Sequence, residues 1–357
     1  MVTPDEDRVV LKIGTTSLVT DGRLEPEKVE RLCAAVRLGI RAGLAPVVVT
    51  SGAIAIGRTR HAALGDANGA GQQVAAAIGQ GLLYGALQET FASYGLETGQ
   101  VLLTPYDLIE ADRGERVRAT FDEMRSLGVV PIVNENDALG VRNNDVLAAL
   151  LSGFLRAGLL VLLTNVPGLY DRDPQLGGKA TRIGKVAELT PQLEALAGGT
   201  VVAGGTGGMQ MKLSACWIAT YSGVRTVIAD TADPAVLVAA REGADIGTAF
   251  APRPVRGARP DAGRLWRAFR TPPRGAVTCA PAGLIAIEHR QALRRIQVTT
   301  ARGQFHAGDV VDITGPDATL LARGSIRYPA SAVEFGCEPG TALLVGSDYV
   351  RIRRDAP

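Results

Sequence analysis

Two of the five lysines in the chain lie beside short glycine-containing turns. Lys12 ends an apolar run and is followed by Gly14 and by the hydroxyl residues at 15–17. Lys212 follows the glycine-rich segment 204–208, at the start of a helical pattern. Backbone N–H groups in such turns and at helix N-termini bind phosphate, and an ammonium group adds a compact positive charge. The two segments therefore predict a site for phosphate groups.

Each turn also allows a simpler explanation. The GxxxxGK[ST] spacing of a Walker A phosphate loop is absent, and residues 12–17 also fit an ordinary strand-to-helix connection. The segment 204–208 also fits a flexible linker, although Lys212 and the helical pattern after it favour a phosphate site. The prediction therefore depends on the two turns meeting in the folded chain.

Polar clusters follow two other apolar runs. Thr50-Ser51-Gly52 follows the first, and its small side chains would let a ligand approach the backbone. Asn134-Glu135-Asn136-Asp137 follows the second, and Asn143-Asn144-Asp145 comes shortly after it. These residues fit a binding site for a small polar molecule, but some of the second group also fit helix N-caps.

The elements expected to position these residues alternate between short apolar strands and helices. Strands without polar alternation, separated by helices, predict an α/β fold with a mainly parallel sheet covered on both faces, which is a three-layer sandwich. The predicted strands are 9–14, 46–50, 100–104, 129–133, 159–164 and 226–229. The predicted helices are 26–41, 72–94, 111–127, 145–156 and 208–221. Ligands of such sheets bind beyond the carboxyl ends of the strands.

The length of 357 residues predicts two domains. We assign residues 1–250 to the α/β domain and 251–274, which is rich in Pro and Arg, to a linker. Residues 275–357 are predicted to form a small all-β domain. Its expected strands are 284–288, 295–300, 309–314, 342–346 and 349–354.

Composition excludes several classes of protein. Hydrophobic residues make up 46% and charged residues 21%, and no apolar run reaches the ~20 residues of a membrane span. The N-terminus lacks the features of a secretion signal, so we expect a cytoplasmic protein. The four cysteines and three histidines are scattered, which predicts neither a disulfide framework nor a protein-bound metal site. Residues 1–250 carry 22 basic and 27 acidic residues, whereas 251–357 carry 16 and 9.

In their order along the chain, five motifs resemble the amino acid kinase family. They are VVLKIGTTSL, VVVTSGAIAIG, VVPIVNENDA, LLTNVPGLYDRDP and GTGGMQMK. The resemblance covers roughly residues 1–250 and implies the amino acid kinase fold. It is greatest to members that use ATP to phosphorylate the side-chain carboxylate of glutamate, the first step of proline biosynthesis. The C-terminal segment is similar in size and strand spacing to a PUA domain.

The resemblance implies roles for particular residues. Lys12 and Lys212 would contact the ATP phosphates, and Asp145 would hold both lysines by ion pairs. Ser51, Asp137 and Asn144 would bind glutamate. The remaining residues of the nucleotide site would be Gly14, Thr164, Asn165, Thr206, Gly207, Gly208, Met209, Gln210 and Met211. The implied ligands are L-glutamate, ATP and Mg²⁺ bridging its phosphates.

The resemblance also implies a homo-oligomer, a dimer or tetramer, and inhibition by proline. Two departures from familiar members bear on the site: Asn165 stands where they carry an aspartate, and the loop before Asn143 is shorter. Two alternatives remain open. The chain could phosphorylate N-acetylglutamate, aspartate, carbamate or a nucleoside monophosphate, or its basic C-terminal segment could bind RNA.

Overall fold

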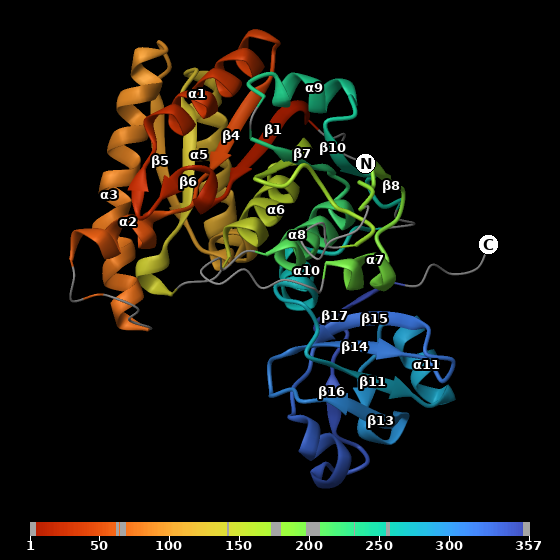
Figure 1. Cartoon of the computed structure of the whole chain (residues 1–357). Helices are drawn as coiled ribbons and strands as arrows, with labels where there is room; N and C mark the ends of the chain where they lie inside the picture. The colour runs from red at the N-terminus through yellow and green to blue at the C-terminus, as the bar shows by residue number, and fades with distance from the viewer. Residues whose placement is uncertain are drawn as a thin grey trace. The chain divides into compact units, whose positions relative to one another are not determined.

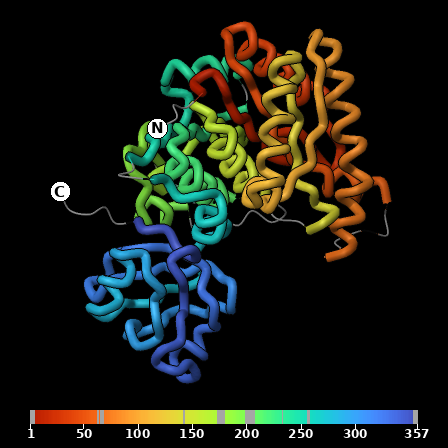
Figure 2. Tube along the Cα trace, turned by 180° about the vertical axis from the view of Figure 1, so that it is seen from behind, coloured from red at the N-terminus to blue at the C-terminus, as the bar shows by residue number. Residues whose placement is uncertain are grey.

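The computed structural model describes residues 5–61, 64, 69–140, 143–172, 180–197, 208–231, 233–254 and 258–352. The chain forms two compact units, Met1–Val255 and Arg256–Pro357. Figure 2 shows the two units from behind, coloured by residue number. None of the helices in the described part of the chain is long and apolar enough to cross a membrane.

The first unit contains an eight-stranded sheet in the order β5-β6-β4-β1-β7-β9-β10-β8. Neighbours from β5 to β9 pair in parallel, whereas β10 is antiparallel to β9 and parallel to β8. The predicted mainly parallel sheet is therefore confirmed. The strands are β1 (Asp5–Ile13), β4 (Ala45–Val49), β5 (Thr98–Leu103), β6 (Val130–Glu135), β7 (Ala157–Thr164), β8 (Lys185–Val186), β9 (Arg225–Asp230) and β10 (Gly247–Phe250).

Helices cover both faces of this sheet (Figure 1). One face packs against α1, α3 and α9, and the other against α5, α6 and α8. The helices of this unit are α1 (Pro26–Arg41), α2 (Ala53–Arg60), α3 (Ala70–Ser93), α4 (Pro105–Ile109), α5 (Ala111–Ser126), α6 (Asn144–Phe154), α7 (Pro191–Leu196), α8 (Met209–Tyr221) and α9 (Val236–Glu242). The described part of this unit also contains two 3-10 turns, η1 (Thr15–Ser17) and η3 (Asp137–Leu139), and a hairpin of β2 (Val19–Thr20) and β3 (Arg23–Leu24).

The alternation of side chains along β1 determines on which face of the sheet Lys12 lies. Val9, Leu11 and Ile13 pack in the core that includes α1, α3 and α9. Side chains alternate along a strand, so Lys12 points to the opposite face, towards α6 and α8. Because β4, β1, β7 and β6 run parallel, the loops that follow them meet at one edge of the sheet.

The second unit is built on a five-stranded sheet in the order β13-β11-β14-β15-β17. Its own core includes Val277, Ile313 and Leu343. This separate β-sheet unit is consistent with a PUA-like domain. The strands are β11 (Gly275–Cys279), β12 (Leu293–Arg294), β13 (Val298–Gly303), β14 (Val310–Thr314), β15 (Leu320–Ser325), β16 (Ala342–Leu344) and β17 (Tyr349–Arg351), with β12 paired to β16.

The strand predicted at 284–288 is wrong, because these residues lie in helix α11 (Pro281–Glu288). Pro281 occupies the first helical position, where its missing N–H costs nothing. Gly283, Ala286 and Ile287 are buried at helical spacing, whereas Ile285 is 57% exposed. The apolar run of this segment fits both periods, and tertiary packing selects the helix.

The segment 251–274, for which the sequence predicts an irregular linker, contains helix α10 (Ala262–Phe269). The side chain of Asp261 caps the helix by accepting the N–H of Arg264 at 2.9 Å. Leu265, Ala268 and Phe269 are buried, and α10 packs on β15 and β17. The many Pro and Arg residues around this short helix obscure its apolar face in the sequence.

Glycines allow α2 and α3 to approach closely. A Cβ atom at Gly79 of α3 would overlap the carbonyl oxygen of Ala53, the first residue of α2. A Cβ atom at Gly57 of α2 would overlap the carbonyl oxygen of Ala75 in the same way. The two helices are therefore locked together directly after the Thr50-Ser51-Gly52 turn.

Gly79→Ala is expected to lower the free energy of unfolding by about 1–3 kcal/mol, because α2 and α3 must separate to admit the methyl group. Gly81→Ala on the same helix is the control, since a Cβ atom there meets open space. It should stabilise the chain by about 0.5–1 kcal/mol through helix propensity. Urea unfolding measures both changes. Equal changes in the free energy of unfolding for the two variants would contradict this packing.

Candidate active site

Lys12 and Lys212, 200 residues apart in sequence, meet at one carboxylate. The Nζ atom of Lys12 lies 2.8 Å from Oδ1 of Asp145. The Nζ atom of Lys212 lies 3.1 Å from Oδ2 of the same residue. The three side chains come from β1, α8 and α6, and all are buried, Asp145 completely. The structure thus brings together the two lysines of the predicted phosphate site.

Helix capping places the carboxylate. Asn143 precedes α6, and its side chain accepts the N–H groups of Asp145 at 2.9 Å and Val146 at 3.3 Å. Asp145 therefore sits in the first turn of α6, where a negative charge is favourable. Lys212 occupies the first turns of α8, which begins after Gly208.

Burial and charge act on this cluster in opposite directions. Burial alone would raise the pKa of Asp145, but the charges and hydrogen bonds of Lys12 and Lys212 outweigh it, so the pKa lies below its ordinary value. Burial lowers the pKa of Lys12, and the charge of Lys212 adds to this effect, while Asp145 opposes it. Two ammonium groups on one carboxylate leave one uncompensated positive charge, which suits an anionic ligand.

A polar cluster lies beside the lysines, at the end of β6. The side chains of Asn134 and Asn144 both accept the backbone N–H of Glu135, each at 3.0 Å. Asn144 is the neighbour of Asp145, so this cluster is directly connected to the lysine pair. Asp137 is 8% exposed, and burial raises its pKa to about 6.

Ser51 follows β4, which pairs with β6. Thr50 donates its backbone N–H and its hydroxyl to the carbonyl oxygen of Val133, at 2.8 and 3.1 Å. These bonds hold the Ser51 turn against the end of β6, close to the Asn134–Asp137 segment.

The residues predicted for the nucleotide lie on three segments. Gly14 follows β1, and a Cβ atom there would lie 3.9 Å from the Nζ atom of Lys12. Thr164 ends β7, and Asn165 accepts the hydroxyl of Ser17 at 2.9 Å, which ties the loops after β1 and β7 together. Gly208 precedes α8, and Met209, Gln210 and Met211 form its first turn. Thr206 and Gly207 lie outside the described residues.

The sequence predicted Ser17 only as one hydroxyl of the phosphate turn, and it did not predict Gln80. Ser17 joins the two loops as described, and Gln80 of α3 accepts the side-chain amide of Asn134 at 2.6 Å. Gln80 lies in a helix, 54 residues from its partner. The only signal in the sequence is one amide within an apolar stretch, AAAIGQGLL, and it does not name a partner.

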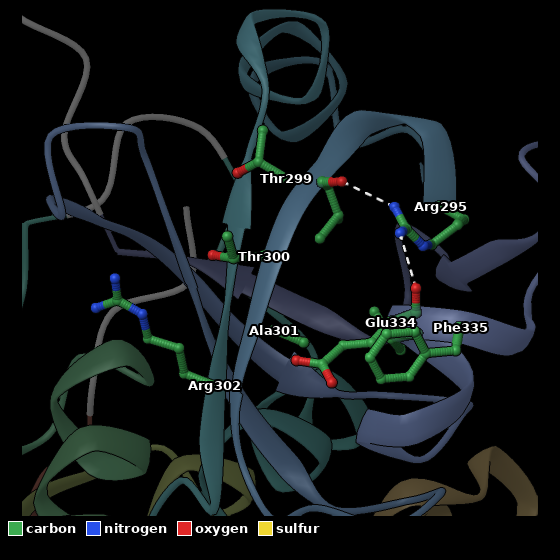
Figure 3. Close-up of a pocket in the computed structure, with 9 residues that line it drawn as sticks. Arg295, Thr299, Thr300, Ala301, Arg302, Glu334 and Phe335 are labelled. Atoms are coloured by element: carbon green, nitrogen blue, oxygen red, sulfur yellow. Dashed lines mark hydrogen bonds between the residues drawn. The ribbon is translucent and has the colours of Figure 1, made fainter.

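A cavity of about 390 Å³ lies in the second unit, between β13 and the turn Ala332–Gly336 (Figure 3). Arg295 donates to the carbonyl oxygens of Val298 at 3.0 Å and Glu334 at 3.3 Å, so its guanidinium group supports the local backbone. Phe335 is 90% exposed. The cavity has no paired titratable groups comparable to the lysine–aspartate cluster, and we place the candidate chemistry in the first unit.

Asp137→Asn is expected to raise the free energy of unfolding near neutral pH, since the folded wild-type chain must bury an ionised carboxylate there. The difference between the ordinary pKa of 3.8 and about 6 corresponds to at most about 3 kcal/mol. A raised pKa means that the folded state holds the proton more tightly. The wild-type chain therefore loses this stability as the pH rises from about 4 to about 6.

Urea unfolding of both chains at about pH 4.5 and about pH 8 measures this effect. The gain in the free energy of unfolding of Asp137→Asn over the wild type should be large at the higher pH and small at the lower one. Glu89→Gln, at an exposed position of α3, is the control and should give the same difference at both values. An advantage for Asp137→Asn that does not change with pH would contradict a buried, titrating carboxylate.

Known proteins are similar to this chain in sequence and in fold. A model of the amino acid kinase family matches residues 7–230. The chain is 38% identical over 338 residues to glutamate 5-kinase of Nocardia farcinica, covering 90% of this chain and 88% of that protein. It is 36% identical over 334 residues to glutamate 5-kinase of Moorella thermoacetica, covering 91% and 88%. UMP kinase of Ureaplasma parvum superposes with a TM-score of 0.50 at 15% identity, over 69% of this chain and 99% of that one, which shows a shared fold. The chain belongs to the amino acid kinase family.

Proposed function

We propose that this chain is a glutamate 5-kinase, which uses ATP to phosphorylate the γ-carboxylate of L-glutamate in the first step of proline biosynthesis. One observation carries the chemical part of the proposal: two lysines from distant segments meet at a buried carboxylate. The curated relatives named glutamate 5-kinase, at 36–38% identity over most of the chain, support the substrate.

The reaction needs positive charge more than it needs a base. The γ-carboxylate has an ordinary pKa of ~4.3 and is already ionised at neutral pH. One of its oxygens attacks the γ-phosphorus of ATP, the bond from that phosphorus to the bridging oxygen breaks, and ADP leaves. Both reactants are anions, so their repulsion is the main obstacle. Lys12 and Lys212 reduce it and stabilise the charge that moves to the bridging oxygen.

The residues around the lysines divide into two groups in this proposal. Ser51, Asp137 and Asn144 bind glutamate, and the carboxylate of Asp137 pairs with its ammonium group. The nucleotide lies on the other side of the lysines. Its contacts are Lys12, Gly14, Thr164, Asn165, Thr206, Gly207, Gly208, Met209, Gln210, Met211 and Lys212. Asp145 positions both lysines rather than touching either substrate.

Magnesium enters as part of the substrate, the complex of Mg²⁺ with ATP. The described residues contain no group of three or more His, Cys, Asp or Glu side chains that could hold a metal ion. Asp145, the acidic residue between the lysines, already has two ammonium partners. Phosphate oxygens and water therefore supply most ligands of the ion.

The remaining expectations stay predictions. They are a homo-oligomeric state, dimer or tetramer, inhibition by proline, and a location in the cytoplasm. The RNA-binding alternative has less support, because stacking of bases needs exposed aromatic rings. Phe269, Phe305 and Tyr349 of the second unit are each at most 2% exposed, so the exposed rings among its described residues are Phe335, at 90%, and Tyr328, at 37%.

Turnover with a panel of acceptors tests the proposed substrate. The chain is expected to form ADP from Mg²⁺ and ATP only when L-glutamate is added, and hydroxylamine should trap the acyl phosphate as a hydroxamate. N-Acetylglutamate, aspartate, carbamate and UMP are the comparison acceptors. If turnover is faster with any of these four acceptors than with glutamate, that acceptor is the substrate. The assignment as a kinase would then still hold.

Lys212→Met is expected to lower kcat at least about 100-fold, because one of two charges on the transferring phosphoryl group is lost. Glutamate should still bind, as measured by calorimetry, because its predicted contacts lie in the turns after β4 and β6 and at the start of α6. Lys185→Met, at an exposed position of β8, is the matched control and should retain full turnover. A Lys212→Met chain with near-normal kcat would refute the role of this lysine.

A further inference from the structure

We propose that Gln80 of α3 is a positioning residue for the glutamate subsite. It would act through Asn134 and the backbone of Glu135, without touching either substrate. The proposal rests on the proposed function for its kinetic consequence. Its structural part concerns one hydrogen-bond chain that links α3, β6 and α6, and this part can be tested on the chain alone.

The chain of hydrogen bonds begins inside the first unit. Nδ2 of Asn134 donates to Oε1 of Gln80 at 2.6 Å. Oδ1 of Asn134 accepts the backbone N–H of Glu135 at 3.0 Å, and Oδ1 of Asn144 accepts the same N–H at 3.0 Å. Asn134 is 1% exposed, so water offers its amide little substitute for the oxygen of Gln80.

The direction of every hydrogen bond in this series follows from one donor, the backbone N–H of Glu135. A backbone N–H can only donate, so Glu135 requires an oxygen from Asn134 and an oxygen from Asn144. The amide nitrogen of Asn134 must then point towards α3. Gln80 in turn must present its oxygen. The Glu135 N–H thus selects the orientation of the Asn134 amide, and the oxygen of Gln80 supports that orientation by accepting its N–H.

The same series of hydrogen bonds reaches both halves of the proposed site. Glu135 lies two residues before Asp137, the expected partner of the substrate ammonium group. Asn144 lies one residue before Asp145, which holds Lys12 and Lys212. A turned or displaced Asn134 amide would therefore disturb the end of β6 before it disturbs the lysines. The effect should fall on glutamate binding more than on phosphoryl transfer.

The packing of α3 makes Gln80 a rigid support. Gly79 is its neighbour, and the α2 backbone at Ala53 approaches so closely that no Cβ atom fits there. Helix α3 also contacts η3 (Asp137–Leu139). Gln80 therefore enters the site from an element that cannot easily shift, which a positioning role requires.

Two variants separate the hydrogen bond from the shape of the side chain. Gln80→Met keeps the length of the side chain but removes the acceptor, and Gln80→Glu keeps an acceptor oxygen. Gln80→Met should raise KM for glutamate about tenfold, the usual effect of one lost hydrogen bond, with kcat and KM for ATP within about twofold. Gln80→Glu should restore KM to within about threefold of the wild type.

Hydrogen exchange at the Glu135 amide, followed by NMR without substrates, is the second measurement. Exchange should be faster in Gln80→Met and near the wild-type rate in Gln80→Glu. Gln88→Met, at an exposed position two turns further along α3, is the control and should change neither KM nor exchange.

Normal exchange and a normal KM in Gln80→Met would overturn the proposal, as would equal losses in Gln80→Met and Gln80→Glu. A wild-type chain that forms no acyl phosphate from glutamate would instead refute the proposed function. In that case the exchange rates alone decide whether Gln80 orients Asn134.

Discussion

The ion pairs of Asp145 are the interaction on which the site depends. Two buried ammonium groups would repel each other, and burial lowers the pKa of Lys12. A single buried carboxylate between them supplies the compensating charge and a fixed point for both. Removing one partner of such a cluster costs several kcal/mol, on the order of 3–5, because the remaining charges stay buried. The cluster therefore constrains where β1, α6 and α8 can lie.

The fold satisfies this constraint with three local devices. The alternation of β1 turns Lys12 away from the core of α1, α3 and α9. The Asn143 cap starts α6 at Asn144. This places the buried carboxylate of Asp145 in the first turn of the helix. The start of α8 after Gly208 places Lys212 on the same side. The parallel sheet then brings the loops after its strands to one edge, where the polar cluster at the end of β6 and the lysine pair meet through the adjacent residues Asn144 and Asp145.

Sequence reasoning was most successful where one local signal is strong. Helix α1 has the predicted bounds, Pro26–Arg41, because Pro26 marks its first turn and its apolar residues recur at helical spacing. The meeting of Lys12, Asp145 and Lys212 agrees with what the resemblance implied. The helix at 281–288 and α10 were missed, since short apolar runs do not distinguish a helix from a strand without their packing partners.

Gln80 shows a different limit. Its contact with Asn134 joins a helix to a strand 54 residues away, and no local pattern encodes such a pair. Polar residues inside helices usually face solvent, so an amide in an apolar stretch predicts neither burial nor a partner. Only the close packing of α2 on α3, which depends on Gly57 and Gly79, brings it to the end of β6.

A crystal structure of this chain with L-glutamate and a non-hydrolysable ATP analogue tests the central claim most directly. The account predicts both Nζ atoms, of Lys12 and Lys212, within hydrogen-bonding distance of the β- or γ-phosphate oxygens, with Asp145 still between them. An analogue bound with its phosphates away from either lysine would contradict it.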